Sequence, residues 1–302
     1  MVKLRMWLLI FATAVLAISS SSAWAESGAL DTSPAKEQSQ WWNILLLGGD
    51  SLSKTGYERT DSIIILSINK VDKQVKMTSI MRDTWVSFPG SPRSGKINAA
   101  NVYGGPELSM ETVNACFGTD VEDYVLINMV GLIEVIDMIG GVEIPVTESE
   151  RKLIGPYAKG YLSILGSYDG DTTLSESGDS VHLNGLQAMS YCRIRVIGTD
   201  YARTQRQRTV ILGGLEKLKQ SNAAQILSLV RVGLENTQTN LGLTDVYGLA
   251  IFALEMDQNA IEQYRIPADG TFDSGMKDGT WSIQPDFEAN RELLQEFIYG
   301  VD

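Results

Sequence analysis

Apolar residues along this chain gather in short runs separated by polar and glycine-containing stretches. The stretches NILLLGGD (43–50), TDSIIILSIN (60–69) and VKMTSIM (75–81) each contain a short group of apolar residues, which predicts buried strands. Turn residues at 69–73 predict that the second and third of these strands form a hairpin. Shorter apolar runs predict further strands at 123–128, 142–146 and 264–267.

Segments with helical spacing alternate with these strands. Gly105-Pro106-Glu107 predicts a helix start with proline in the first turn, and Gly118 predicts its end. Residues 129–139 place apolar positions at helical spacing. Further helices are predicted after an arginine-rich stretch to about 221, then at 223–235, from 244 and near 286–299. This alternation predicts an α/β fold whose mixed sheet is covered by helices on both faces.

Two stretches have no clear periodicity. Residues 147–180 are polar and contain glycines, and we interpret them as an irregular excursion near the entrance of a site. His182, the only histidine, lies in HLNG, which has the composition of a turn before a short helix, so its predicted role is helix capping.

The N-terminus has the pattern of an export signal. Lys3 and Arg5 precede an apolar run at 6–18, and small residues follow as far as Ala25. An uncleaved anchor is the alternative, because 6–25 is just long enough to cross a bilayer. We divide the chain into this signal peptide or anchor (1–25), a polar tether (26–41) and one folded domain (42–302) with a core at 42–220 and a C-terminal portion at 221–302. In both cases the domain lies outside the cytoplasm.

Composition narrows the classes of function. The chain has 302 residues, 44% of them hydrophobic, and a formal net charge of −12. This acidic balance argues against nucleic-acid binding, which normally requires a basic domain. Cys116 and Cys192 leave two alternatives open, a disulfide in an exported protein or two buried free thiols.

One basic stretch stands out against the acidic background. YCRIRVIGTDYARTQRQR (191–208) contains Arg193, Arg195, Arg203, Arg206 and Arg208. The first two have strand spacing and the later ones have helical spacing, so a strand that leads into a helix would direct both sets to one point. Guanidinium groups gathered in this way repel each other unless an anion lies between them. We therefore expect these arginines to converge on a small anionic ligand in a cleft.

Acidic residues lie at the ends of the first two predicted strands. Asp50 follows the first strand, and Arg59 and Asp61 flank the start of the second. Two carboxylates and an arginine at one edge of a sheet suit a divalent cation such as Mg²⁺ that bridges phosphate oxygens. The alternative is that Asp50 caps a turn while Arg59 and Asp61 form a surface ion pair.

Further polar groups follow the third strand. Arg82-Asp83 is either part of the same site or an ordinary salt bridge, and Lys96 and Asn98 of GKINAAN are either phosphate ligands or solvated side chains. The sequence contains no Gly-x-Ser-x-Gly elbow, no Cys/His cluster, no Walker loop and no dinucleotide fingerprint. These absences weigh against serine hydrolases, zinc enzymes and nucleotide-binding proteins.

Seven ordered stretches carry a resemblance to a known family. They are NILLLGGD, RTDSIIILSIN, SIMRDTWVSFPG, KINAANVYGGPE, DYVLINMVGLIEVIDMIGGVEI, HLNGLQAMSYCRIR and DYARTQRQR. The chain resembles the LytR–CpsA–Psr (LCP) family of cell-wall glycopolymer phosphotransferases, strongly over about 42–220 and weakly beyond. It departs from the family pattern at Met81, where many relatives have proline, in the segment 147–180, and in a leader that looks cleavable.

The resemblance implies a three-layer α/β/α sandwich with a central mixed sheet and an apolar groove for a polyprenyl chain. It implies Mg²⁺-dependent transfer of a phospho-glycopolymer, of teichoic-acid or capsular-polysaccharide type, from polyprenyl pyrophosphate to peptidoglycan. The implied partners are that lipid-linked glycopolymer, peptidoglycan and the membrane surface, with no nucleic acid. The implied location is the outer face of the membrane or the cell wall.

The resemblance also assigns roles to individual positions. Asp50 and Asp61 match the acidic positions associated with Mg²⁺. The positions that match pyrophosphate-binding residues are Arg59, Arg82, Lys96, Arg193, Arg195, Arg203 and Gln207. The expected catalytic residues are Asp61, Asp83, Arg82 and Arg195.

Some alternatives remain open within this reading. Asp61 and Asp83 are both candidates for the base that deprotonates the acceptor hydroxyl, and a metal or a substrate oxygen could serve instead. Two other functions also fit: a phosphatase or pyrophosphatase that acts on the same lipid with water as acceptor, and a non-catalytic lipid-binding regulator of cell-envelope genes.

Overall fold

The structure, a computed structural model, describes residues 40–50, 58–198, 200–221, 223–257 and 260–300. The predicted leader (1–25) and nearly all of the predicted tether (26–41) lie outside the described residues. Among the helices that are described, none has both the length and the apolar character needed to cross a membrane.

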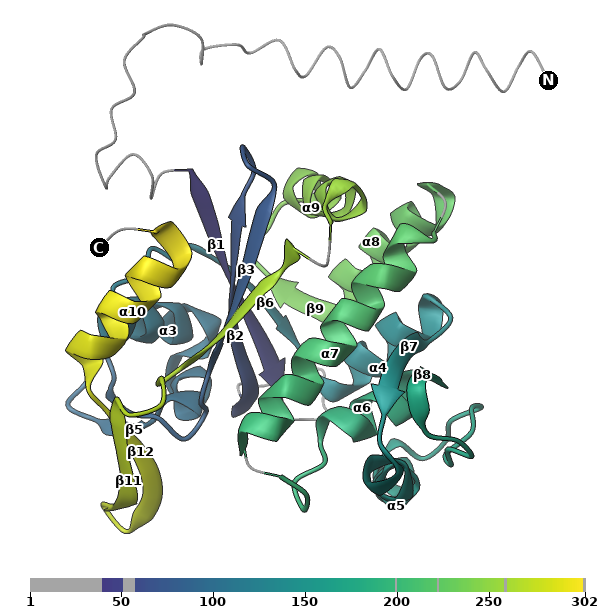
Figure 1. Cartoon of the computed structure of the whole chain (residues 1–302), viewed down its shortest axis with the longest axis horizontal. Coiled ribbons are helices and arrows are strands. Elements are labelled where there is room, and N and C mark those ends of the chain that lie inside the picture. Colours follow the sequence, from purple (N-terminus) through teal and green to yellow (C-terminus); the bar gives the residue numbers. More distant parts are fainter. Residues whose placement is uncertain (1–39, 51–57, 199, 222, 258–259, 301–302) are drawn as a thin grey trace, which may run out of the picture.

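A mixed sheet forms the centre of the domain (Figure 1). In the described part of the chain, six strands follow the order β10-β3-β2-β1-β6-β9. Their bounds are β1 Trp41–Gly49, β2 Thr60–Asn69, β3 Gln74–Ile80, β6 Asp123–Ile127, β9 Thr237–Thr239 and β10 Glu262–Ile266. Strand β2 is antiparallel to β1 and to β3, which confirms the predicted hairpin. Strands β6 and β10 run parallel to β1 and β3, so the sheet is mixed as expected.

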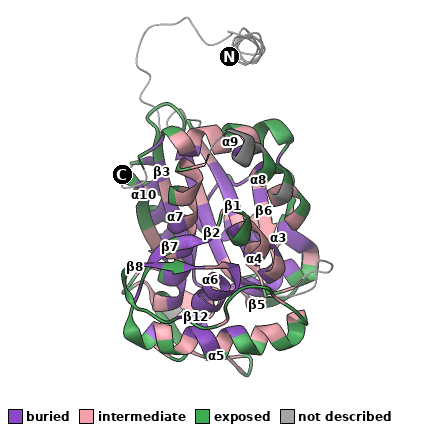
Figure 2. Ribbon diagram, turned by 90° about the vertical axis from the view of Figure 1, so that its right-hand side faces the viewer, coloured by how far each residue is buried: buried purple, intermediate pink, exposed green. Residues whose placement is uncertain are grey.

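Helices cover both faces of this sheet and complete the predicted three-layer sandwich. The helices are α3 Ala100–Phe117 and α10 Phe287–Tyr299 on one face, and α4 Met129–Met138, α7 Asp200–Lys219, α8 Ala223–Asn236 and α9 Leu243–Glu255 on the other. Alternation along β1 explains the two cores, since Leu45 and Leu47 pack with Phe117 and Leu294 on the first face, while Leu46 faces the second. Figure 2 shows buried residues along the strands and exposed residues on the outer helix surfaces.

Glycines end or interrupt the helices at the predicted places. Gly118 caps α3 in the left-handed region, with φ of 67°. Helix α3 begins earlier than predicted, at Ala100, but its backbone departs from helical angles at Gly104 and Gly105. Gly105 has φ of 70°, and the chain turns back into a helix at Pro106. The Gly-Pro signal therefore marks a kink and a restart rather than the first turn of the helix.

A second, smaller layer packs outside the main sheet. It consists of β7 Val142–Val146, β8 Gly178–Leu183, α5 Glu148–Leu165 and α6 Gly185–Cys192. Strand β7 was predicted correctly, but it pairs with β8 in a separate two-stranded sheet. Its side chains form a core with α6 and α7 that includes Ile144, Leu183 and Val210.

Two predictions about this layer were wrong. Residues 147–180 are irregular only at 166–177, because Thr147 and Glu150 form a capping box that starts α5 and β8 begins at Gly178. His182 lies inside β8, where its Nδ1 is 2.9 Å from the Glu143 carboxylate on β7. The cap of α6 is instead Asn184, whose side chain accepts a hydrogen bond from the Gln187 backbone N–H.

Short hairpins complete the described chain. They are β4 Trp85–Ser87 with β5 Ser94–Lys96, and β11 Phe272–Lys277 with β12 Thr280–Pro285, while a 3-10 turn at Ile97–Ala99 leads into α3. Cys116 and Cys192 are free thiols that belong to different cores. Burial raises the pKa of Cys116 to about 11, so this thiol stays protonated at neutral pH.

Candidate functional site

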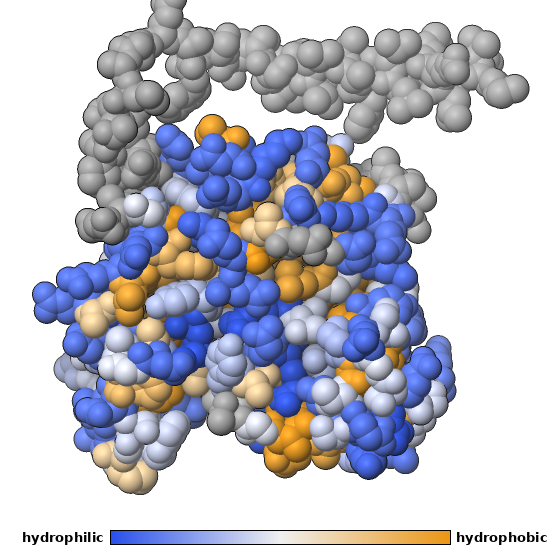
Figure 3. Space-filling model, viewed as in Figure 1, coloured by the Kyte–Doolittle hydropathy of each residue, from blue (hydrophilic) through white to orange (hydrophobic). Residues whose placement is uncertain are grey.

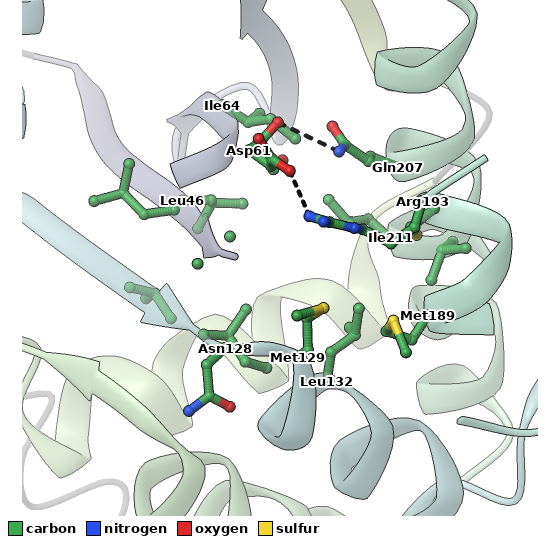
Figure 4. Close-up of a pocket in the computed structure, with 18 residues that line it drawn as sticks. Leu46, Asp61, Ile64, Asn128, Met129, Leu132, Met189, Arg193, Gln207 and Ile211 are labelled. Carbon is green, nitrogen blue, oxygen red and sulfur yellow. Dashed lines mark hydrogen bonds and ion pairs between the residues drawn. The ribbon is translucent and has the colours of Figure 1, made fainter. Parts of the chain in front are cut away.

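Asp61 lies at the centre of a charged cluster at the start of β2. Asp61 is only 6% exposed, and its carboxylate accepts hydrogen bonds from the guanidinium groups of Arg82, Arg193 and Arg195. Figure 4 shows Arg193 pointing toward Asp61 from the opposite wall of a pocket. With the adjoining Asp50, Asp83 and Lys96, the cluster contains four cations and three carboxylates, and this excess of positive charge favours an additional anion.

The three arginines come from two separate parts of the chain. Arg82 follows β3, the neighbour of β2, so adjacent strand ends bring it to Asp61. Arg193 and Arg195 were expected on a strand, and this was wrong: α6 ends at Cys192 and Arg193 is its C-cap residue. The loop that follows still directs both guanidiniums to the same carboxylate, so the predicted convergence of these two residues is found without the predicted strand.

Arg193 joins two carboxylates. One of its terminal nitrogens pairs with Asp61, the other with Asp50 at the end of β1, and its Nε donates to the Tyr161 hydroxyl at 3.1 Å. The hydroxyl of Tyr157 accepts the Arg195 backbone N–H at 3.2 Å. Both tyrosines lie on α5, the helix that was missed, and their spacing of four residues places them on one face. Sequence reasoning therefore missed two residues that position the arginines.

The cluster controls the ionisation of Asp61. Burial by itself would raise the pKa of this carboxyl group, but the charges of Arg193, Arg82 and Arg195 and the hydrogen bond from Arg82 outweigh it and hold the pKa below its usual value. Asp61 is therefore a carboxylate at neutral pH. Such a strongly stabilised anion is a weak base but a good ligand for cations.

Asp83 and Lys96 extend the cluster on the side of Arg82. The Asp83 carboxylate lies 3.4 Å from Nε of Arg82 and 2.7 Å from Nζ of Lys96. Arg82-Asp83 was expected to be either part of the site or an ordinary salt bridge. Both descriptions apply, because the two side chains form an ion pair and lie in the site. Asn98 is buried, and its backbone N–H donates to the Arg82 carbonyl at 3.3 Å.

The remaining candidate residues are Gln207, Arg203 and Arg59. Gln207, on α7, donates from its side-chain amide to the Asp61 carbonyl at 3.5 Å. Arg203 is also on α7 and only 2% exposed. Arg59 is exposed, and its carbonyl accepts the Asp50 N–H at 2.9 Å. Among the described residues, the ion pairs of Asp61 are with other arginines, so the surface pair with Arg59 considered above is not formed.

Arg206 and Arg208 do not join this cluster, which corrects the expectation that all five arginines converge. Arg206 is bound by Glu150 at 2.7 Å and donates to the carbonyls of Ile194 and Ile197. It therefore ties α7 to α5 and to the arginine-bearing loop. Arg208 points to another face of α7 and donates to Gln263 and Ser79.

An apolar slot opens beside the charged cluster. It has a volume of about 270 Å³ and lies between the sheet strands β1, β2 and β6 and the helices α4, α6 and α7. Figure 4 shows Leu46 and Ile64 on the sheet side and Met129, Leu132, Met189 and Ile211 on the helix side, with Asp61, Arg193 and Gln207 at one end. On the molecular face in Figure 3, strongly hydrophilic residues gather below the centre, with apolar residues visible above them.

The candidate ligands for a metal ion are the carboxylates of Asp50 and Asp61. No group of three or more His, Cys, Asp or Glu side chains is positioned to hold a metal among the residues that the structure describes. Asp50 and Asp61 are nevertheless close enough for the single guanidinium of Arg193 to contact both. A cationic group thus already lies between these two carboxylates, and a pair of this kind fits a Mg²⁺ ion that takes its other ligands from phosphate and water.

The protein is an α/β/α sandwich with an apolar slot that ends at a cluster of guanidinium groups. These features define a class of protein that can bind an amphiphile with an anionic head group. The comparisons agree with this class. The model of the LytR_cpsA_psr family matches residues 12–297, and the chain belongs to that family.

Named relatives share this family. Polyisoprenyl-teichoic acid–peptidoglycan teichoic acid transferase TagU from Enterococcus faecalis is 33% identical over 219 residues, which cover 70% of this chain and 65% of that protein. The chain thus aligns with slightly less than two thirds of the length of this relative. TagU from Bacillus anthracis is 28% identical over 260 residues, which cover 84% of this chain and 77% of that protein.

Solved structures confirm the fold. TagV from B. subtilis has 26% sequence identity and a TM-score of 0.67, and the match covers 86% of this chain and 97% of that one. A structure of YwtF (TagT) with bound octaprenyl pyrophosphate lipid has 23% identity and a TM-score of 0.65, with 91% and 95% of the two chains covered. At this level of identity the second match supports the α/β/α architecture alone.

Proposed function

We propose that this chain transfers a phospho-glycopolymer, of teichoic-acid or capsular-polysaccharide type, from a polyprenyl pyrophosphate carrier to peptidoglycan. The observation that carries the proposal is the position of the Asp61 cluster, with three guanidiniums at one end of an apolar slot. An activity of this kind in the 33% identical TagU relative supports the same choice of substrates.

The slot and the cluster suit the two halves of such a carrier. A prenyl chain that enters the slot is removed from water, at about 0.8 kcal/mol per buried CH₂. The diphosphate that follows the chain would meet Arg82, Arg193 and Arg195 at the end of the slot. Arginine forks bind phosphate oxygens in pairs, which fixes the orientation of the head group as well as its position.

Phosphoryl transfer from a diphosphate requires neutralisation of negative charge more than covalent catalysis by the protein. A transferred phosphoryl group spreads charge over its oxygens, and catalysis comes mainly from positioning and from electrostatic stabilisation. Asp61 holds the three guanidiniums close together. The diphosphate oxygens compete for the same donors, so the cluster is preorganised before the substrate arrives.

Mg²⁺ is the proposed cofactor, and Asp50 and Asp61 are the residues that would hold it. Bound there, the ion would neutralise charge on the leaving lipid phosphate. The exchange of Arg193 from the two carboxylates to the phosphate would make room for the ion. Arg193 has a raised pKa, because Asp61, Tyr161 and Asp50 together outweigh the effect of its burial, so it carries a full charge to the phosphate.

Asp83 is the proposed base that accepts the proton of the acceptor hydroxyl. Asp61 suits this role less well, because three guanidiniums stabilise its anion. Asp83 pairs with Arg82 and Lys96, and its backbone carbonyl accepts a hydrogen bond from the Ile283 N–H at 2.9 Å. It therefore lies at the border between the charged cluster and the β11–β12 hairpin.

The proposed place of action is the outer face of the membrane or the cell wall. The pattern of residues 1–25 supports export, either with cleavage or with retention as an anchor. The catalytic domain would then meet its lipid carrier at the membrane surface and its acceptor in the wall, with no role for nucleic acid.

One incubation tests the function against its rivals. The purified chain is mixed with a polyprenyl-pyrophosphate-linked glycopolymer, Mg²⁺ and peptidoglycan oligomers, and the products are separated. A covalent glycopolymer–peptidoglycan product is expected, and EDTA should slow its formation sharply. Release of inorganic phosphate or a free sugar phosphate instead would identify a phosphatase or pyrophosphatase, and unchanged lipid would indicate a binding or regulatory protein. Activity that is insensitive to EDTA would remove the proposed role of Mg²⁺.

A further inference from the structure

A second cavity lies on the other side of the charged cluster from the lipid slot. It has a volume of about 650 Å³ and is formed by the N-terminal half of α7, by β10 and by the β11–β12 hairpin. Figure 1 places this hairpin at one end of the molecule beside the first turns of α7. None of the roles assigned above uses this cavity.

The cavity and the slot are separated by shared elements. On α7, Tyr201, Gln205 and Arg208 line the second cavity, whereas Gln207 and Ile211 line the slot, so the two sets occupy different faces of one helix. After β3, Met81 lines the second cavity, and the next residue, Arg82, binds Asp61. The charged cluster therefore lies between the two cavities.

The lining of this cavity is aromatic. Tyr201 and Trp281 are each 49% exposed, and Phe272 and Tyr264 contribute further ring surface. The guanidinium of Arg265 stacks over Tyr201 at 5.3 Å. Exposed aromatic rings present flat apolar faces in a hollow that water also reaches, which suits a ligand with an apolar face and a polar edge. A sugar ring has both.

The polar groups of the cavity offer hydrogen-bond donors to a ligand. Arg208 directs its nitrogens to Gln263, Ser79 and Gln205 at 2.8, 2.6 and 2.6 Å. Both glutamines receive this guanidinium on their side-chain oxygens, which leaves their NH₂ groups turned away from Arg208 as donors. Arg265 pairs with Asp269. The amide donors suit the hydroxyl and N-acetyl oxygens of a sugar, and the aromatic faces, which a phosphate chain does not need, favour a sugar over a teichoic-acid chain.

We propose that this cavity binds the sugar rings of the peptidoglycan glycan strand and thereby positions the acceptor hydroxyl at the diphosphate. The assignment rests on the proposed function for the identity of the acceptor. In phosphoryl transfer the attacking and leaving oxygens lie roughly in line on opposite sides of phosphorus. The leaving lipid phosphate belongs to the slot, so the attacking hydroxyl must arrive from the opposite side, where this cavity lies and where Asp83 contacts the hairpin.

Binding of defined saccharides tests the proposal without any need for transfer. The probes are a peptidoglycan tetrasaccharide with its peptides removed and a glycerol-phosphate oligomer, each titrated calorimetrically into the full domain. The variants are Tyr201→Ala and Trp281→Ala. The control is Tyr103→Ala, which removes an aromatic residue of similar exposure, 50%, on α3 outside the cavity. Melting curves confirm that each variant is folded.

The tetrasaccharide should bind the wild type and the Tyr103 variant equally and each cavity variant about tenfold more weakly, because each loses one stacking contact. Trp281→Phe should restore most of the affinity. In the transfer assay the KM for the acceptor should rise by a similar factor. Equal tetrasaccharide binding in all variants, or loss of glycerol-phosphate binding in its place, would overturn the proposal. Transfer with an unchanged acceptor KM would overturn it while the proposed function stands.

Discussion

Arg193 donates a hydrogen bond to the Asp61 carboxylate, a residue 132 positions earlier in the chain. The same guanidinium also pairs with Asp50, so one side chain joins the end of β1, the start of β2 and the end of α6. This relationship brings together carboxylates and guanidiniums that the sequence separates widely. In the proposed reaction, Arg193 moves from these two carboxylates to the phosphate of the substrate.

Arg195→Ala should lower the rate of transfer by about 10²–10³, because it removes one donor from the diphosphate. The melting temperature should stay nearly constant, since the side chain is 42% exposed and lies on a loop. A transfer assay together with a melting curve measures both effects. Arg231→Ala is the matched control, because its side chain is 80% exposed and pairs with Glu235 on the same helix. Wild-type turnover in the Arg195 variant would count against the site.

Asp61→Asn should destabilise the protein in the absence of ligand. Removing the central anion leaves Arg82, Arg193 and Arg195 without their common partner, at a cost on the order of 2 kcal/mol, which is lower than for a fully buried pair because solvent screens Arg195. Added inorganic pyrophosphate should restore part of the loss by placing an anion among the three cations. Thermal melts with and without pyrophosphate measure this. A variant as stable as the wild type, or one that pyrophosphate does not affect, would contradict the role of Asp61.

Glu150→Gln should weaken the fold rather than the chemistry. The Glu150–Arg206 pair is buried, with side chains 11% and 7% exposed, and breaking such a pair costs about 3 kcal/mol. Burial alone would raise the pKa of Glu150, but hydrogen bonds from Arg206 and Thr147 lower it overall. A lowered pKa in the folded state means that the stabilisation is complete above the unfolded value of about 4.3 and is lost as the pH falls through the folded value.

Melting temperatures of the wild type and the Glu150 variant from pH 7 to pH 3 check this prediction. The difference between the two proteins should be constant above about pH 4.5 and should shrink below it. If the difference in melting temperature grew on acidification, the pKa of Glu150 would be raised rather than lowered in the folded protein. That result would refute the proposed stabilising role of the Glu150–Arg206 pair.

Leu132→Trp should fill part of the slot and weaken binding of long prenyl diphosphates while leaving inorganic pyrophosphate binding unchanged. For the wild type, affinity should rise with prenyl length by up to about 0.8 kcal/mol per buried CH₂ until the slot is full. Calorimetric titrations with a series of chain lengths measure both effects. Equal affinity for short and long chains would show that the prenyl tail does not enter the slot.

The features that the sequence predicted well are those with local signals. The position of β2 follows from the apolar residues at 63–66 and Ile68, and the end of α3 follows from Gly118, which adopts the left-handed conformation expected of a C-cap glycine. The three-layer fold follows from the alternation of such signals. The convergence of Arg82, Arg193 and Arg195 on Asp61 agrees with the clustering that was expected.

The features that were missed depend on contacts between distant residues. Helix α5 is mostly polar and contains Gly155-Pro156, which is a typical turn signal, so the sequence did not predict a helix despite the capping box. The spacing of Arg206 matches that of its neighbours in the arginine-rich stretch, but its partner Glu150 lies 56 positions away. Helical spacing shows which side chains share one face of a helix. Which residues that face contacts depends on the tertiary fold.

A crystal structure of the domain with a bound prenyl diphosphate would show the head group and the tail of the ligand together. The phosphate oxygens should lie within hydrogen-bonding distance of Arg82, Arg193 and Arg195, and the prenyl tail should lie in the slot between Leu46 and Leu132. A head group bound away from Asp61, or a tail that lies on the outer surface, would contradict the proposed site.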